Sequence, residues 1–201
     1  TDPKTSAIRL LSAEAKTKET YTHIDVVPGR YTDSTNSDCY LYQNGGDKER
    51  LKTNLDTHIT HIRDSGVTDA LKLLKLWRVL NGLDVKQFAF ELLGVEVLKD
   101  KKNATLADQL DHFFDTVSQS DNPIKIEDPA NPTGNDLMPI LASAWPSLQK
   151  VANQTLETIQ NSGLDSVYGD TGATEDSSTV EQLSAAIHIA KQHQPTKPWS
   201  A

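Results

Sequence analysis

The chain has 201 residues, a net charge of −8 and a single cysteine, Cys39. This length suits one domain that buries a core of its own, and one cysteine excludes a disulfide framework or a multi-cysteine zinc site. Because the chain is acidic and has no apolar run long enough to cross a bilayer, we expect neither strong non-specific nucleic-acid binding nor a membrane-spanning helix. The cysteine usage leads us to expect a cytoplasmic protein.

The charge is distributed unevenly along the chain. Residues 1–100 carry 14 basic and 15 acidic groups, whereas residues 101–201 carry 6 and 13. A site for phosphates is therefore expected in the first half.

The first part of the chain predicts strands. Short β-branched segments at 7–11 and 21–27 are typical of strands, and residues 38–43 predict a third. Asp25 lies within the second of these segments, although aspartate is depleted inside strands. Two interpretations stay open: an exposed strand face, or a carboxylate held on rigid backbone for a hard cation such as Mg²⁺.

After a turn at 44–46 the apolar period changes from 2 to 3.6, which predicts helices. The first is expected at 48–64, with Asp47 as its N-cap and an inner face formed by Leu51, Leu55, Ile59 and Ile62. The later ones are expected at 68–81, at 86–99, from a cap at Thr105 onward, and at 137–161, where Pro146 should kink the helix or mark its start.

Two loops and a tail complete the prediction. Residues 121–136 contain three prolines and a glycine and predict a loop, and residues 162–178 predict a mobile one. A capping box at Ser178–Glu181 predicts a last short helix before an extended tail. Because strands come first and helices follow, the expected fold class is α+β.

Two helices carry residues suited to a nucleotide. The helix at 68–81 is apolar around most of its circumference, yet Lys72, Lys75 and Arg78 form a stripe along it at a spacing of three. The stripe is either a narrow solvated edge or a cationic edge directed at a triphosphate. In the next helix Gln87 precedes Phe88, whose ring belongs either to the core or to a surface that stacks on a base.

Other candidate sites are weaker. His58 and His61 are three apart on a predicted helix and could face one metal, but no third ligand stands at a suitable spacing, so ordinary surface histidines are favoured. Cys39 has no positive charge beside it, which favours an inert thiol. The common P-loop and dinucleotide-binding glycine patterns are absent.

Four segments, taken in order, resemble the template-independent nucleotidyltransferases that include 2′-5′-oligoadenylate synthases, cyclic GMP-AMP synthase and the bacterial cyclic-oligonucleotide synthases of antiphage defence (CD-NTases). The segments are Ile24-Asp25-Val26-Val27-Pro28, Leu73-Leu74-Lys75-Leu76-Trp77, Gln87-Phe88-Ala89-Phe90-Glu91-Leu92-Leu93 and Asp128-Pro129-Ala130-Asn131-Pro132-Thr133-Gly134-Asn135. The last three look especially like oligoadenylate synthase, which has Lys-x-Trp, Gln-Tyr-Ala-Leu-Glu-Leu-Leu and Asp-Pro-Ala-Asp-Pro-Thr-Gly-Asn at the equivalent places.

The resemblance implies roles for these residues. Asp25 would be a catalytic, metal-binding carboxylate, Lys75 would contact the triphosphate of the nucleotide, and Gln87 and Phe88 would contact or stack on a base. The loop at 128–135 would be structural. Lys72 and Arg78 join the nucleotide-binding set on spacing alone. The implied cofactor is Mg²⁺ or Mn²⁺, the implied substrates are ATP, GTP or other NTPs, and a regulatory protein is an implied partner.

The chain departs from the family in one respect. The family's Gly-Ser motif and its paired acids precede the strand that holds the third carboxylate, and the 24 residues before Asp25 contain neither. We therefore expect either the later two-thirds of a longer enzyme, which the start at Thr1 favours, or a non-catalytic module that binds a nucleotide or a protein. On the first view, residues 1–46 are the remnant of a catalytic antiparallel sheet, 47–161 a helical lobe, and 162–201 a mobile loop, short helix and tail.

Overall fold

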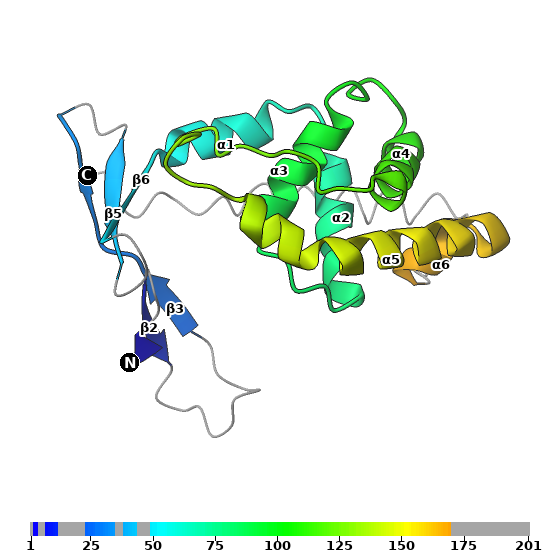
Figure 1. Ribbon diagram of the computed structural model, residues 1–201, viewed down its shortest axis with the longest axis horizontal. Helices are drawn as coiled ribbons and strands as arrows, with labels where there is room; N and C mark the ends of the chain where they lie inside the picture. Colours follow the sequence, from blue (N-terminus) through cyan, green and yellow to red (C-terminus); the bar gives the residue numbers. More distant parts are fainter. Residues whose placement is uncertain (1, 4–6, 12–22, 35–37, 44–48, 170–201) are drawn as a thin grey trace, which may run out of the picture. The chain divides into compact units, whose positions relative to one another are not determined.

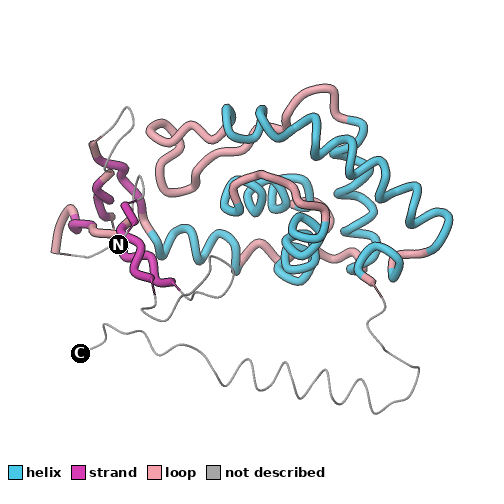
Figure 2. The backbone as a smooth tube through the Cα atoms, turned by 90° about the horizontal axis from the view of Figure 1, so that it is seen from below, coloured by secondary structure: helices cyan, strands magenta, loops and turns pink. Residues whose placement is uncertain are grey.

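The computed structural model describes residues 2–3, 7–11, 23–34, 38–43 and 49–169. Its contacts divide the chain into two units, residues 1–157 and 158–201. Strands occupy the early part of the described chain and helices follow (Figure 2), which confirms the α+β class. The predicted domain borders after residues 46 and 161 stay predictions.

The strands form two antiparallel sheets of three strands each. The first sheet contains β1 (Asp2–Pro3), β2 (Ile8–Leu11) and β3 (His23–Val26), and the second contains β4 (Gly29–Tyr31), β5 (Cys39–Tyr42) and β6 (Arg50–Thr53). The strands predicted at 7–11, 21–27 and 38–43 are thus confirmed where these residues are described. The strands β1, β4 and β6 are additional to the prediction.

The helix predicted at 48–64 is wrong in its first part. Residues 50–53 form β6 instead, in register with β5, so that Leu51 pairs with Leu41 and Thr53 with Cys39. The sequence period around Leu51 is compatible with a helix, but pairing with a strand ten residues upstream satisfies the same backbone groups. Asp47, the predicted N-cap, lies outside the described residues. The helix begins after Asn54, whose side chain accepts a hydrogen bond from the N–H of Thr57 at 2.9 Å.

The helices follow in chain order (Figure 1): α1 (Leu55–Arg63), α2 (Thr68–Leu80), α3 (Gln87–Leu98), α4 (Leu106–Gln119), α5 (Met138–Ser162) and α6 (Asp165–Tyr168). Those predicted at 68–81 and 86–99 are confirmed to within a residue or two. Gly82 follows the end of α2 with φ = +60°, the left-handed conformation that commonly terminates a helix. Thr105 caps α4 by accepting a hydrogen bond from the N–H of Asp108. Because α5 begins at Met138, Pro146 lies within the helix and does not mark its start.

The core lies between α2, α3, α4 and α5. Trp77, Phe90, Phe113 and Phe114 are fully buried there, with ring centroids 5.0–6.3 Å apart. Trp77 Nε1 donates a hydrogen bond to Thr155 Oγ1 at 2.9 Å, which attaches α5 to α2. In α4 the side chains of Leu110, Phe113, Phe114 and Val117 are buried and Leu106 is exposed. In α5 those of Ala144, Leu148 and Thr155 are buried, and Val151 and Ile159 are half-buried.

The inner face predicted for the first helix is not buried. Leu55 is 58% exposed and Ile59 50% exposed, and no residue of α1 is buried. The mobile loop predicted at 162–178 is interrupted by α6 at residues 165–168. The helix predicted from Ser178 and the tail lie outside the described residues. In the part of the chain that is described, none of the helices is both long and apolar enough to traverse a bilayer.

Candidate functional site

Asp25 lies in the middle of β3, where its Cα partner on β2 is Arg9. Strand alternation places it on the opposite face from Ile24 and Val26, and its side chain is exposed. The antiparallel setting expected for Asp25 is therefore present. The described residues contain no group of three or more His, Cys, Asp or Glu side chains that could hold a metal ion. One carboxylate does not make a two-metal site, so the described residues do not by themselves fit the implied metal.

The three cations of α2 are engaged by different partners. Lys72 Nζ lies 2.7 Å from Asp69 Oδ1 in an exposed ion pair one turn away, a type of pair that contributes little to stability. Arg78 Nη1 donates to the carbonyl oxygen of Val85 at 2.8 Å, while its Nε is buried without a hydrogen-bond partner in the described structure. The three cations of the stripe therefore make separate contacts. Lys72 forms a solvated ion pair, Arg78 holds the turn after α2, and Lys75 reaches α3.

Lys75 and Gln87 meet at the carboxylate of Glu91. Lys75 Nζ lies 2.8 Å from Glu91 Oε1, and Gln87 Nε2 lies 3.4 Å from the same oxygen. The Glu91 side chain is only 15% exposed. Because Gln87 and Glu91 are four apart on α3, they share one face of the first turns of that helix. The structure thus brings together two of the predicted nucleotide-binding residues at the point where α2 contacts α3.

Phe88 belongs to the same turn of α3 and is half-buried. Its ring lies against the imidazole of His58 on α1, with ring centroids 4.6 Å apart and planes tilted by 43°. Phe88 is therefore not sealed in the aromatic core, which the next aromatic residue, Phe90, joins instead. Phe88 keeps some solvent exposure, which is compatible with stacking on a base.

His58 in turn contacts a buried carboxylate. Its Nε2 lies 2.7 Å from Oδ1 of Asp128, whose side chain is only 1% exposed. The same Oδ1 accepts a hydrogen bond from the N–H of Ala130 at 2.9 Å, and Oδ2 accepts one from Asn135 Nδ2 at 2.7 Å. Burial by itself raises the pKa of Asp128, but the hydrogen bonds from Asn135, His58 and Ala130 outweigh it, so the pKa lies below its ordinary value. Asp128 is therefore an anion at neutral pH.

The loop that holds Asp128 has a fixed internal structure. Asn131 Nδ2 donates to the carbonyl oxygen of Lys52 at 3.0 Å, which attaches the loop to β6. A side chain at Gly134 would collide with the amide of Asn131, so that amide would have to move away from the carbonyl oxygen of Lys52. No helix or strand forms between Ser120 and Leu137, as predicted for 121–136. The loop thus joins the second sheet, through Asn131, and α1, through Asp128.

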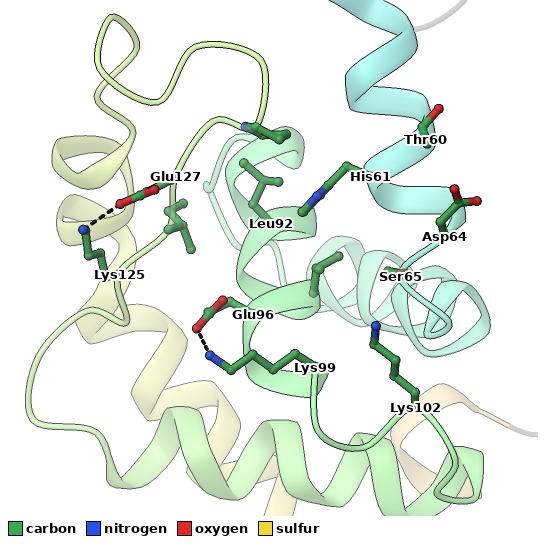
Figure 3. Close-up of a pocket in the computed structure, with 13 residues that line it drawn as sticks. Thr60, His61, Asp64, Ser65, Leu92, Glu96, Lys99, Lys102, Lys125 and Glu127 are labelled. Carbon is green, nitrogen blue, oxygen red and sulfur yellow. Dashed lines mark hydrogen bonds and ion pairs between the residues drawn. The ribbon is translucent and has the colours of Figure 1, made fainter.

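A pocket of about 680 Å³ lies beside this network (Figure 3). His61 of α1 and Leu92 of α3 point into it, and Lys102 extends toward the turn that holds Ser65. Its other lining residues are Thr60, Asp64, Val95, Glu96, Lys99, Lys125, Ile126, Glu127 and Pro129. Lys99 pairs with Glu96 and Lys125 with Glu127, each at 2.6 Å, so the charges of the lining are balanced. Neither Asp25 nor any predicted nucleotide-binding residue lines this pocket.

The weaker candidates have ordinary environments. His58 contacts Asp128 and His61 lines the pocket, and no metal-binding group of three includes either of them among the described residues. Cys39 is buried, and burial together with the charge of Asp38 raises the pKa of its thiol. A raised pKa disfavours the reactive thiolate, in agreement with an inert thiol.

The sequence did not indicate three contacts of the candidate site. These are the pairing of Glu91 with Lys75, the packing of His58 on Phe88, and the hydrogen bond of His58 with the buried Asp128. Glu91 stands four residues after Gln87, a spacing that indicates a shared helix face. The pairing of His58 with Asp128 spans 70 residues, and no local sequence signal indicates it.

Comparison with known proteins supports the fold. No model of a known protein family matches the sequence, and no curated protein matches it. Among solved structures, the chain is similar to one described as the "Structure of E. coli MS115-1 CdnC:HORMA-deltaN complex", with a TM-score of 0.54 and 15% sequence identity. The match covers 83% of this chain and 60% of that chain, so the present chain spans less than two thirds of its length. At this identity the likeness shows a distant CD-NTase-like fold and nothing finer.

Proposed function

We propose that this chain carries the later part of a nucleotidyltransferase that joins NTPs into cyclic or linear oligonucleotide second messengers in bacterial antiphage defence. The observation that carries the proposal is the fold likeness to a CdnC chain over 83% of the present chain. The four sequence segments that resemble this class of enzyme also support it, because that resemblance rests on residue order and not on the fold.

The proposed nucleotide-binding residues are those around Glu91. An ammonium group has three donors, so Lys75 Nζ can keep its 2.8 Å contact with Glu91 and still donate to a phosphate oxygen. Phe88 offers part of its ring to a base, and Gln87 lies beside it with an amide for the base edge. Lys72 and Arg78 are proposed on their spacing from Lys75 alone: Lys72 has an exposed side chain, and Arg78 already donates to the carbonyl oxygen of Val85.

The proposed reaction is attack of a ribose hydroxyl on the α-phosphate of an NTP, with pyrophosphate as the leaving group. The contribution of Lys75 is electrostatic, because a fixed cation beside the phosphates stabilises charge that shifts toward the leaving group. Asp25 is the proposed catalytic carboxylate and the proposed ligand of Mg²⁺ or Mn²⁺. Since a two-metal site needs several carboxylates, we propose that the others lie outside the described residues.

A regulatory protein is the proposed partner. The similar solved structure is described as a complex of CdnC with a HORMA protein, and we propose that the protein to which this chain belongs is also controlled by a protein partner.

A non-catalytic module that binds a nucleotide or a protein is the second candidate. It is favoured by the internal contacts of Lys75 with Glu91 and of Arg78 with Val85, which give both cations a structural use without any ligand.

Release of pyrophosphate tests the proposal. The protein containing this chain is incubated with Mg²⁺ or Mn²⁺ and the four NTPs, with and without nucleic acid or a protein partner, beside an Asp25→Ala variant. We expect release that the variant loses, and none from the 201-residue chain alone. Release by the short chain would refute the need for further carboxylates. Inactivity of the whole protein under all conditions would favour the second candidate.

A further inference from the structure

The helix α1 depends on a polar anchor for its position. It buries none of its residues, and its apolar side chains at Leu55 and Ile59 are at least half exposed. His58 is one of three half-buried residues of α1, with Thr57 and Ile62, and its side chain is 19% exposed and lies 2.7 Å from the buried carboxylate of Asp128. Hydrophobic burial of α1 is therefore incomplete, and the hydrogen bond of His58 adds a polar attachment.

The same hydrogen bond fixes the orientation of the imidazole. Asp128 is ionised, and an ionised carboxylate only accepts hydrogen bonds, so His58 Nε2 must be the donor. The other two contacts of this carboxylate, from Ala130 and Asn135, come from its own loop and keep it in place. The imidazole is attached to the chain at one end and hydrogen-bonded at Nε2 at the other, so rotation of its plane is restricted.

That plane lies against Phe88. The two ring centroids are 4.6 Å apart, so the imidazole lies against the phenyl ring of the half-buried Phe88. Phe88 is flanked on α3 by Gln87 and Glu91, and Glu91 holds Lys75. His58 therefore packs on Phe88, which lies on α3 next to the residues that hold Lys75, the proposed contact of the triphosphate.

We propose that His58 is a positioning residue for the nucleotide base: anchored by Asp128, it holds the Phe88 ring in the orientation on which the base stacks. This inference rests on the proposed function, since it assigns Phe88 to the base. It adds α1 and the loop at 128–135 to the parts of the chain that decide nucleotide affinity, although neither touches the nucleotide.

Two variants separate the two contacts of His58. His58→Gln keeps an amide donor in place of Nε2 for Asp128 but removes the ring that lies on Phe88. His58→Phe keeps a ring and removes the donor. The matched control is His61→Gln, one turn along the same helix, where the side chain lines the pocket. Each protein is titrated with ATP and, in the same magnesium buffer, with inorganic tripolyphosphate, which has the phosphates without the base.

We expect both His58 variants to weaken ATP binding while tripolyphosphate binding stays within about two-fold of the wild type. Stacking of a base on an aromatic ring corresponds to roughly 5- to 150-fold in affinity, and the loss for His58→Gln should reach at least the lower end. In a Phe88→Ala background, His58→Gln should cause no further loss, because the ring it positions is gone. His61→Gln should bind both ligands like the wild type.

The outcomes distinguish this inference from the proposed function. If the wild type prefers ATP to tripolyphosphate and Phe88→Ala removes that preference, but the His58 variants keep it, the positioning role is wrong and the proposed function stands. Equal losses for ATP and tripolyphosphate in the His58 variants would also overturn positioning, because they indicate a general structural defect. If the wild type binds neither ligand, the proposed function fails and the positioning role fails with it.

Discussion

Removal of the Asp128 carboxylate should destabilise the fold strongly. The side chain is 1% exposed and accepts three hydrogen bonds, from His58, Ala130 and Asn135. Asp128→Ala leaves all three donors without their acceptor, and each buried donor left unsatisfied in this way costs about 1–3 kcal/mol. Asp128→Asn keeps an oxygen for His58 and Ala130, and a rotated Asn135 amide can accept from the new NH₂ group. Its expected cost is smaller, about 1–2 kcal/mol, because the bonds lose their charge and not their partners.

Urea unfolding followed by circular dichroism at 222 nm measures both costs. The midpoint should fall for Asp128→Ala and less for Asp128→Asn, with the slope unchanged. Asp121→Ala is the control, because Asp121 is exposed at the start of the same loop and a surface change there should cost no more than about 0.5 kcal/mol. A cost for Asp128→Ala below about 1 kcal/mol would refute the view that this carboxylate anchors the loop and α1.

The same carboxylate predicts a pH dependence with a definite sign. Its burial is outweighed by hydrogen bonds, so the pKa of Asp128 in the folded protein lies below the value in the unfolded chain. A group of this kind stabilises the fold fully above the unfolded pKa of about 3.9 and loses that contribution as the pH falls through the folded pKa. The stability difference between wild type and Asp128→Asn should therefore shrink from pH 7 to pH 3. A difference that is constant over this range would contradict the assignment.

Three further changes have expected outcomes. Lys75→Ala should weaken ATP binding, measured by calorimetry, and lower the free energy of unfolding, because Glu91, whose side chain is only 15% exposed, loses its cation; unchanged affinity would remove Lys75 from the site. Phe88→Tyr should keep ATP affinity and Phe88→Ala should lose about 1–3 kcal/mol of it; equal affinities for both variants would argue against stacking. Thr155→Val should lower the unfolding free energy by about 1–3 kcal/mol, measured in urea, because the buried indole N–H of Trp77 loses its acceptor; a neutral result would indicate that this hydrogen bond does not hold α5.

The helices of the core could be predicted because their signals are local. In α4 the buried residues Leu110, Phe113, Phe114 and Val117 recur at helical spacing, and Thr105 provides the cap. The glycine at the end of α2 adopts the positive φ that its position indicates. Periodicity and capping act over a few residues, so the sequence alone contains what is needed.

The first helix was mispredicted because the competing structure is not local. Leu51 fits a helical period with Leu55, but it pairs with Leu41 across the hairpin of β5 and β6. Backbone pairing between strands depends on residues that no short window contains. Leu55 and Ile59 were expected to be buried but are exposed. An apolar helix face is buried only where another part of the fold covers it, and the sequence period does not show whether such a partner exists.

The candidate site was predictable in its residue types and not in its contacts. Lys75 and Phe88 stand out in the sequence as a cation and an aromatic ring at unusual positions. Their partners, Glu91 and His58, come from other helices, and Asp128 lies 70 residues beyond His58. A stripe of three cations along α2 suggested one common target, whereas the fold gives each cation its own partner. Only tertiary structure decides which residues of a helix face meet.

The proposed nucleotide site lies where α2 meets the start of α3. A backbone NMR titration of the 201-residue chain with ATP in a magnesium buffer measures binding there directly. We expect the largest shifts at the amides of Lys75, Gln87, Phe88 and Glu91, with smaller ones at His58. No shifts at these amides, or shifts confined to Thr60, His61 and the other residues of the neighbouring pocket, would contradict it.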